Sequence, residues 1–156
     1  MATKLAPLAD GSEPSLGYAF ADLLRLLRRD FYSRASGFGL TPALARVLFH
    51  VHRAPGSRQT DLAARLEVTP VTLGRMIDRL VDRGYVRRDQ DAADRRAVRV
   101  YVAPRGEPLV ARMAQIAEGT KARALQGIGP RQRRTLYSLL SRVAENLGGE
   151  TQSWTR

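Results

Sequence analysis

The chain has no cysteine among its 156 residues, and this absence excludes several kinds of chemistry together. Disulfides, thiolate metal sites, cysteine nucleophiles and cysteine-based redox sensing all require a thiol. The only histidines are His50 and His52, and residues two apart on a helix point in different directions. We therefore expect no metal site and no bound cofactor.

Long apolar runs are also missing. No stretch approaches the ~20 residues that a membrane-spanning helix needs, so we expect no membrane association. Residues 1–15 carry charges and prolines and have no apolar core, which favours a loose tail over a targeting peptide. Without a recognisable targeting segment, the expected location is the cytoplasm.

Negative charge is scarce relative to positive charge. The 15 acidic residues are outnumbered by 26 basic ones, which gives a formal net charge of +11 and favours polyanions or small anions as partners. Only Lys4 and Lys121 are lysine, so nearly all of the positive charge is arginine, whose planar fork suits phosphate and guanine edges. A biased genomic base composition explains the arginine excess equally well, so charge alone locates no site.

Catalytic motifs are missing too. The sequence has no glycine-rich phosphate loop, no nucleophile elbow and no carboxylate pair at a catalytic spacing. The serines are not accompanied by a suitable histidine–acid set. We therefore predict that the chain is not an enzyme; the alternative, a small hydrolase, predicts turnover that tracks the purity of the protein.

Apolar residues recur at helical spacing along most of the chain. Thr41-Pro42 and Thr69-Pro70 each place a capping threonine before a proline at the first helical position. Gly84 is expected to end its helix with a positive φ. The expected helices cover about 16–35, 42–54, 58–66, 70–83, 108–127 and 130–147.

The helices at 58–66 and 70–83 are separated by a tight turn, which predicts a helix-turn-helix. Residues 85–88 and 97–102 alternate apolar with polar side chains, as half-buried strands do. The segment between them is too charged to be packed inside, so the pair predicts a β-wing. The predicted fold class is mainly α: a winged helix-turn-helix with a two-stranded β-wing and long N- and C-terminal dimerisation helices.

The helices at 16–35, 108–127 and 130–147 are amphipathic, and none is needed to complete the helix-turn-helix. Their apolar faces must bury against something, within one subunit or between two subunits. We expect a homodimer, which would place two recognition helices about one DNA turn apart. The expected organisation is a tail at 1–15, a dimerisation helix at 16–40, a DNA-binding lobe at 41–105, C-terminal dimerisation helices at 106–148 and a tail at 149–156.

Several stretches together carry a resemblance to a known family. They are Gln59-Thr-Asp-Leu-Ala63, Thr69-Pro-Val-Thr72, Asp78-Arg-Leu-Val-Asp-Arg-Gly-Tyr-Val86 and Asp91-Ala-Ala-Asp-Arg-Arg-Ala97. They resemble the MarR family of winged-helix transcription regulators, whose wing carries an aspartate followed by two arginines. The order of elements matches this family over about 16–147. The segment from Leu16 onward and the stretch 105–110 further resemble the SlyA-like branch.

The resemblance implies a homodimer that binds a pseudo-palindromic operator in double-stranded DNA, acts as a repressor and associates with the nucleoid. It also implies that a small anionic aromatic effector, such as an aromatic carboxylate, relieves repression by binding between the dimerisation and DNA-binding lobes. Two positions depart from the family pattern. Glu67 stands where many relatives have a turn glycine, and Ala103 stands where many have a threonine that caps the next helix.

The candidate DNA-binding residues lie at the start of the helix after Thr69 and in the wing. A helix start favours phosphate, and short side chains there reach base edges. Arg75 is our candidate for a base contact at guanine, whereas Arg79 and Arg99 are possible phosphate contacts or simply solvated residues. The full set is Thr69, Pro70, Thr72, Arg75, Arg79, Asp94, Arg95 and Arg96.

In the wing, Arg95 or Arg96 is expected to enter the minor groove or to clamp its phosphates. Asp94 would repel DNA if it were free, so we expect it to pair with a wing arginine and to fix the shape of the loop. The alternative for the wing is an exposed charged hairpin with weak surface pairs.

Arg29, Tyr32 and His50 are the candidates for an effector pocket beside the first helix. Core packing or solvent exposure is the alternative for each of them. Two other functions share this fold and charge. A sequence-nonspecific architectural DNA-binding protein would show no preferred site, and a winged-helix protein-interaction module would bind DNA weakly at physiological salt.

Overall fold

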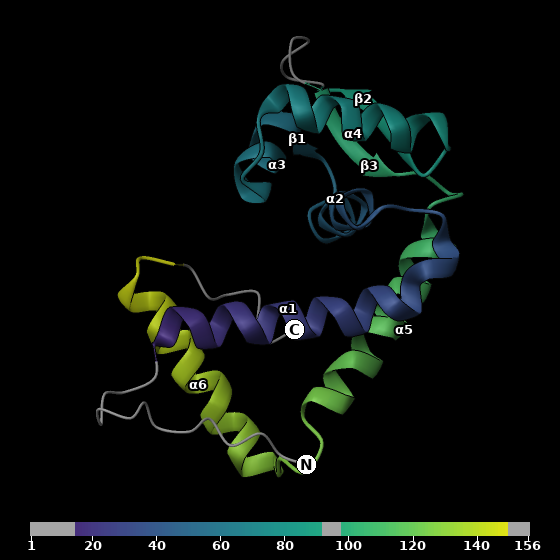
Figure 1. The fold of residues 1–156 in the computed structure, drawn as a ribbon. Helices are drawn as coiled ribbons and strands as arrows, with labels where there is room; N and C mark the ends of the chain where they lie inside the picture. Colours follow the sequence, from purple (N-terminus) through teal and green to yellow (C-terminus); the bar gives the residue numbers. More distant parts are fainter. Residues whose placement is uncertain (1–14, 92–97, 150–156) are drawn as a thin grey trace. The chain divides into compact units, whose positions relative to one another are not determined.

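The computed structural model describes residues 15–91 and 98–149, and it confirms a mainly helical fold with a small β-wing (Figure 1). The chain divides into two compact units, Met1–Thr120 and Lys121–Arg156. Within the described ranges, no helix is long and apolar enough to cross a membrane. The elements in chain order are α1 (Leu16–Ala35), the short 3-10 helix η1 (Ser36–Phe38), α2 (Pro42–Arg53), β1 (Ser57–Arg58), α3 (Gln59–Leu66), α4 (Pro70–Asp82), β2 (Val86–Gln90), β3 (Val98–Val102), α5 (Glu107–Ala124) and α6 (Pro130–Asn146).

Both threonine–proline helix starts form as predicted. Thr41 Oγ1 accepts a hydrogen bond from the backbone N–H of Leu44 at 3.3 Å, and Thr69 Oγ1 accepts one from Thr72 at 3.2 Å. Because proline occupies the first helical position in each case, its missing N–H leaves no intrahelical bond unmade. The predicted helix stop is also confirmed, since Gly84 has a φ of 69°. These local signals fix where α2 and α4 begin and where α4 ends.

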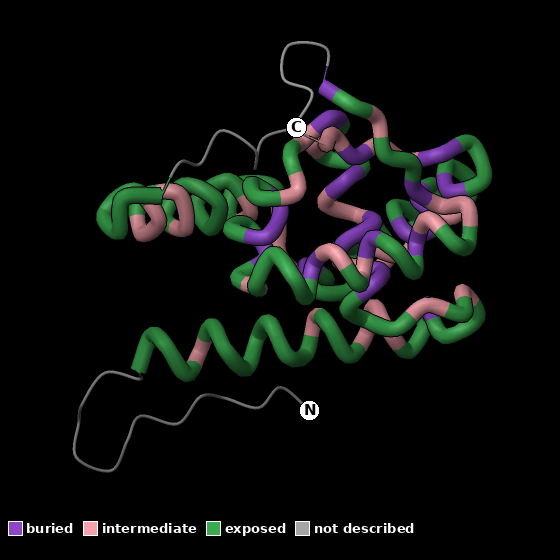
Figure 2. Tube along the Cα trace, turned by 90° about the horizontal axis from the view of Figure 1, so that it is seen from above, coloured by how far each residue is buried: buried purple, intermediate pink, exposed green. Residues whose placement is uncertain are grey.

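The core of the first unit lies where α2, α3, α4, the sheet and the start of α5 meet (Figure 2). Apolar residues recur at helical spacing along α4, and three of them, Leu73, Ile77 and Leu80, are fully buried. Each fully buried aliphatic side chain contributes about 1.5–3 kcal/mol relative to its exposed state. This packing holds one face of α4 inside the unit and turns the opposite face toward solvent.

The wing strands pair antiparallel as predicted, with Val86 opposite Val102 and Gln90 opposite Val98. A third strand extends the sheet to the order β1-β3-β2, so the prediction of two strands was incomplete. β1 is only Ser57–Arg58, which is too short to show an alternating pattern. It exists because these two residues pair with β3, and no local sequence pattern predicts that contact.

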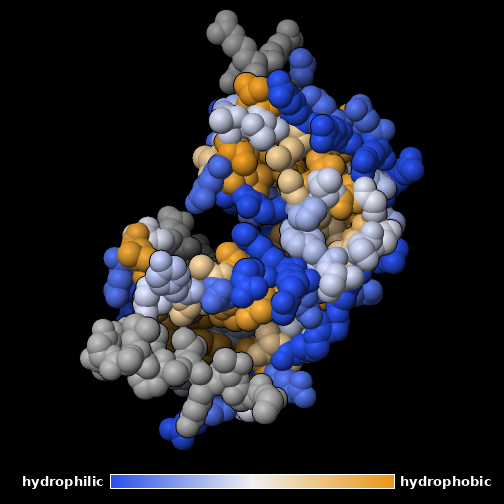
Figure 3. Space-filling view, viewed as in Figure 1, coloured by the Kyte–Doolittle hydropathy of each residue, from blue (hydrophilic) through white to orange (hydrophobic). Residues whose placement is uncertain are grey.

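α1 is largely exposed along its length, including the apolar stripe predicted for it near the N-terminal end (Figure 2). Leu16 keeps 58% of its accessible surface, and Phe20, Leu23 and Leu24 are also exposed. Apolar side chains reach the surface between hydrophilic ones on the face drawn in Figure 3. At the other end of the helix, the buried Thr120 hydroxyl of α5 donates a hydrogen bond to an Asp30 carboxylate oxygen at 2.6 Å.

The second unit contains the end of α5 and all of α6. The Arg133 guanidinium donates hydrogen bonds to the carbonyls of Ile128 and Leu125 at 2.7 and 3.0 Å, which fixes the turn before α6. No residue of α6 is buried, and the apolar face predicted for it is open. Leu147 at its C-terminal end keeps 83% of its surface, and Leu136 and Leu139 are exposed as well.

Glu67 occupies the turn between α3 and α4 with a φ of 54°, a left-handed conformation that a side chain disfavours. We expect Glu67→Gly to raise the free energy of unfolding by about 0.5–1 kcal/mol, because glycine adopts this conformation without steric cost. Urea denaturation at one protein concentration measures the change. Glu67→Ala keeps the unfavourable φ and should give no such gain, and equal midpoints for the two variants would contradict the prediction.

Candidate nucleic-acid interface

Every DNA-contact residue that the sequence predicts for α4 and its N-cap is exposed to solvent. Thr69, Pro70, Thr72, Arg75 and Arg79 are all exposed. Residues three and four apart on a helix lie on the same face, so the last three of these follow one line along α4. Thr72, Arg75 and Arg79 therefore share one solvent-facing side of α4, and Thr69 and Pro70 are exposed at the start of the helix.

Thr69 and Thr72 have different roles at the start of α4. Thr69 Oγ1 accepts from the backbone N–H of Thr72 and donates its own hydrogen to Thr72 Oγ1 at 2.9 Å. Its hydroxyl is thus used for capping, and it fixes the first turn. Thr72 Oγ1 acts as an acceptor here, so its own hydrogen can be offered to a phosphate oxygen or a base edge.

Arg75 and Arg79 point their charge outward from the middle of α4. Among the described residues, neither guanidinium forms an ion pair. An unpaired exposed guanidinium keeps all five of its N–H donors available. The two arginines can therefore take a phosphate or a guanine edge without first breaking a contact within the protein.

Val71 is a member of this surface that the sequence interpretation missed. It keeps 67% of its accessible surface, although it is apolar and stands in the first turn of α4. An exposed valine beside two polar contact residues suits the methyl group of thymine in the major groove. The signal was present in the sequence, since position 71 lies off the buried stripe of Leu73, Ile77 and Leu80.

Arg88 connects the wing to α4. Its guanidinium lies 2.7 Å from a carboxylate oxygen of Asp78 and 3.4 Å from the carbonyl oxygen of Gly74. Asp78 and Gly74 belong to α4, whereas Arg88 belongs to β2. This contact holds the first wing strand against the helix that carries the candidate DNA surface.

A buried carboxylate organises the base of the wing. Asp91 keeps only 5% of its accessible surface, and Arg99 of β3 binds its Oδ2 through Nε at 2.8 Å and Nη2 at 2.7 Å. Arg58 of β1 lies 3.7 Å from the same oxygen. Arg99 also donates to the carbonyl of Gly56 at 2.8 Å. Arg99 is therefore engaged inside the wing and is not simply a solvated residue, whereas its contact with phosphate stays a prediction.

The predicted wing residues Asp94, Arg95 and Arg96 lie outside the described residues. Their assigned roles stay predictions. The aspartate–arginine pairing expected for Asp94 has a counterpart in the described part of the wing, because Asp91 pairs with Arg99 there. Sequence reasoning missed this pair, since Asp91 follows the end of β2 whereas Arg99 belongs to β3.

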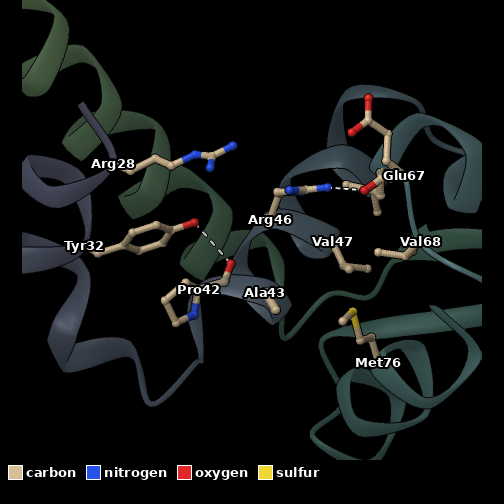
Figure 4. A pocket seen from close by; sticks show the side chains of 10 residues that line it. Arg28, Tyr32, Pro42, Ala43, Arg46, Val47, Glu67, Val68 and Met76 are labelled. Atoms are coloured by element: carbon tan, nitrogen blue, oxygen red, sulfur yellow. Dashed lines mark hydrogen bonds between the residues drawn. The ribbon is translucent and has the colours of Figure 1, made fainter. Parts of the chain in front are cut away.

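A pocket of about 390 Å³ lies beside α1 and α2 and reaches the turn before α4 (Figure 4). This volume is within the ~300–1,000 Å³ range of small-molecule sites. The structure places Tyr32 in its wall, where the phenol donates a hydrogen bond to the carbonyl of Pro42 at 3.1 Å. Arg28 and Arg46 also line the pocket, whereas the predicted effector residues Arg29 and His50 do not.

His50 lies half-buried on α2, and its environment disfavours the protonated imidazole. Burial, followed by the positive charges of Arg46, Arg53 and Arg65, lowers the pKa of His50 below its ordinary value of 6.5. The unfolded chain therefore takes up a proton at this position at a higher pH than the folded chain does. The contribution of neutral His50 to the free energy of unfolding is fully present above the pKa that His50 has in the unfolded chain. It is lost as the pH falls through the pKa that His50 has in the folded chain.

We expect the wild type to lose stability relative to His50→Gln as the pH is lowered from about 7.5 to about 5.5, because only the wild type gains this proton on unfolding. Urea unfolding of both proteins across that range measures the difference. His52→Gln removes an exposed histidine and is the matched control, which should follow the wild type. A constant difference between wild type and His50→Gln would count against the lowered pKa.

Comparison with known proteins adds a family match to this geometry. Residues 38–97, which contain α2, α3, α4 and β2, match a family model described as the MarR family. The transcriptional regulator PA3341 is 32% identical, with a TM-score of 0.77 over 85% of this chain and 97% of that one. A MarR transcriptional regulator from Methanosarcina mazei Go1 is 30% identical, with a TM-score of 0.75 over 84% and 94%. The transcriptional regulator SlyA, at 23% identity, shares the fold with a TM-score of 0.74 over 86% and 94%.

Proposed function

Since this chain belongs to the MarR family of winged-helix transcription regulators, we propose that it is a homodimeric repressor of a pseudo-palindromic DNA operator. Repression ends when a small anionic aromatic compound binds in the pocket beside α1 and α2. The observation that carries the proposal is the outward face of α4. It combines a capped helix start, two arginines without ion pairs among the described residues and an exposed valine.

α4 acts as the recognition helix in the major groove. Arg75 bonds a guanine edge, Val71 contacts a thymine methyl group, and Thr72 and Arg79 contact phosphates. The ion pair between Arg88 and Asp78 keeps the wing in register with this helix. In the wing, Arg95 or Arg96 enters the minor groove, and Asp94 pairs with one of these arginines.

The dimer accounts for the apolar surfaces that a single chain leaves open. α1 and α6 each expose several leucines, and an exposed apolar helix face is stabilised by contact with a second apolar surface. Isologous pairing of two chains covers the same face on both subunits. It also supplies the two recognition helices that a palindromic site requires.

Selection of bound fragments from random double-stranded DNA tests the repressor proposal. We expect a single palindromic consensus whose two halves lie about one helical turn apart. Fluorescence anisotropy with the selected site then gives the affinity in the presence of random competitor DNA. Equal affinity for random DNA would establish the architectural alternative, and weak binding of both at physiological salt would establish the protein-interaction alternative.

We expect Arg75→Ala to weaken binding to the selected site by about 1–3 kcal/mol and to relax the preference at one base pair. Arg79→Ala should weaken binding to specific and random DNA alike, because a phosphate contact carries no base information. Arg25→Ala removes one positive charge from the exposed surface of α1 and is the charge-matched control. A uniform loss for Arg75→Ala would reassign Arg75 to phosphate.

A further inference from the structure

Arg46 links the pocket to the turn of the helix-turn-helix. It stands on α2, lines the pocket and donates a hydrogen bond from its guanidinium to the carbonyl oxygen of Leu66 (Figure 4). Leu66 is the last residue of α3. The final carbonyls of a helix have no intrahelical partner, so this guanidinium satisfies a group that the helix itself cannot.

The Leu66 carbonyl that accepts the hydrogen bond from Arg46 belongs to the turn that sets the direction of α4. Immediately after it, Glu67 takes the left-handed conformation, and its N–H bonds back to the carbonyls of Ala63 and Ala64. The N–H of Val68 also bonds to the carbonyl of Ala63, at 3.1 Å. Thr69 then caps α4. A contact on the Leu66 carbonyl therefore acts on the few residues that set the direction of the recognition helix.

The pocket offers an anion two guanidinium groups. Arg28 extends into it from α1, opposite the side on which Arg46 reaches the turn (Figure 4). Among the described residues, neither arginine forms an ion pair. The Glu67 carboxylate points away from the Arg46 guanidinium in the same view. A carboxylate forms a stronger hydrogen bond with a guanidinium than a neutral carbonyl does, so it competes with Leu66 for Arg46.

We propose that Arg46 is a positioning residue for DNA binding and the point at which an anionic ligand acts. In the free protein, its guanidinium holds the Leu66 carbonyl and keeps the turn before α4 in place. A carboxylate in the pocket draws the guanidinium toward itself and Arg28, which releases the turn and lowers the affinity of α4 for DNA. The ligand half of this inference rests on the ligand-relieved repression proposed above, whereas the turn-holding half does not.

Amide hydrogen exchange tests the turn-holding half without DNA or ligand. Arg46→Met keeps most of the aliphatic stem and removes the guanidinium. We expect the amides of Glu67 and Val68 to exchange about tenfold faster in this variant, as the loss of a charge-assisted hydrogen bond implies. Arg46→Lys restores one charged donor and should recover part of the protection. Arg25→Met, which alters an exposed arginine outside the pocket, should leave these amides unchanged.

Protection at the buried amides of Leu48 and Ile77 reports whether Arg46→Met is folded. Wild-type exchange at Glu67 and Val68 in the folded variant would overturn the inference. If Arg46→Met loses protection at all of these amides, the same comparison is made with Arg46→Lys. Faster exchange of Arg46→Lys confined to Glu67 and Val68 supports the inference, and uniformly faster exchange overturns it.

DNA affinity with benzoate as the probe tests the ligand half. We expect benzoate to weaken operator binding by the wild type, and its neutral isostere benzamide to have no effect. Arg46→Met should bind the operator about tenfold more weakly without benzoate and should respond little to benzoate, because the contact that the ligand breaks is already absent.

The outcomes separate this inference from the proposed function. A variant Arg46→Met that binds the operator as the wild type does and still responds to benzoate would overturn the role of Arg46 and leave ligand-relieved repression intact. A wild type that ignores benzoate would overturn the ligand half together with relief by this class of ligand. The exchange measurement would then decide the turn-holding half by itself.

Discussion

Replacing Asp91 with alanine is expected to lower the free energy of unfolding by about 2–3 kcal/mol. The buried carboxylate holds Arg99 through two short contacts, and Arg58 lies near the same oxygen. Alanine leaves the Arg99 guanidinium at the wing base without a carboxylate partner. Loss of one partner of a fully buried pair costs ~3–5 kcal/mol, and the expected value is smaller because the Arg99 side chain is 39% exposed and partly screened by water.

Asp89→Ala is the matched control for this prediction. It removes a carboxylate two residues away, whose partner Arg87 is largely exposed, so we expect a loss of only about 0–1 kcal/mol. Urea denaturation of both variants at one protein concentration gives the comparison. Similar losses for the two aspartates would show that Asp91 does not organise the wing.

The same pair of variants separates wing position from net charge in DNA binding. Each substitution removes one negative charge, which by itself strengthens binding to a polyanion. If Asp91 holds the wing in place for the minor groove, Asp91→Ala should bind the operator more weakly than Asp89→Ala despite the equal change in charge. Anisotropy at fixed salt measures the difference, and equal affinities would argue against a positioning role in DNA binding.

Much of the DNA-binding lobe follows from signals that are local in the sequence. A threonine before a proline specifies a helix start, and Gly84 specifies a helix stop, because each acts through its own backbone geometry. The buried stripe of α4 follows from helical periodicity, and the outward position of Arg75 follows from the same periodicity. Such features need no knowledge of the rest of the fold.

Contacts between distant segments could not be predicted in this way. β1 has two residues and exists through its pairing with β3, and the Asp91–Arg99 pair joins the residue after β2 to β3. The pocket shows the same limit within α1, where Arg28 lines the wall and the neighbouring Arg29 does not. Successive helical residues point in directions about 100° apart, and only the packed structure decides which one faces the cavity.

Gly106→Ala is expected to lower the free energy of unfolding by about 3 kcal/mol, the upper end of the cost of overpacking a buried position. A Cβ atom at Gly106 would lie 2.3 Å from the carbonyl oxygen of Tyr85 and 3.0 Å from a methyl carbon of Val102. The first of these is a backbone atom, and it already accepts a hydrogen bond from the N–H of Ala103 at 2.9 Å. It cannot move aside without disturbing the junction between the wing and α5.

Gly37→Ala provides the control for this substitution, because a Cβ atom there meets nothing within 4 Å. We expect its free energy of unfolding to stay within about 0.5 kcal/mol of the wild-type value. The Gly106 carbonyl accepts the Val110 N–H at 3.0 Å in the first turn of α5, so the clash also disturbs the start of that helix. Operator affinity should therefore fall together with stability, since the wing and α5 meet at this residue. If Gly106→Ala has the same free energy of unfolding as the wild type, the Tyr85 carbonyl can move to admit the Cβ atom. The junction would then be less tightly packed than its contacts indicate.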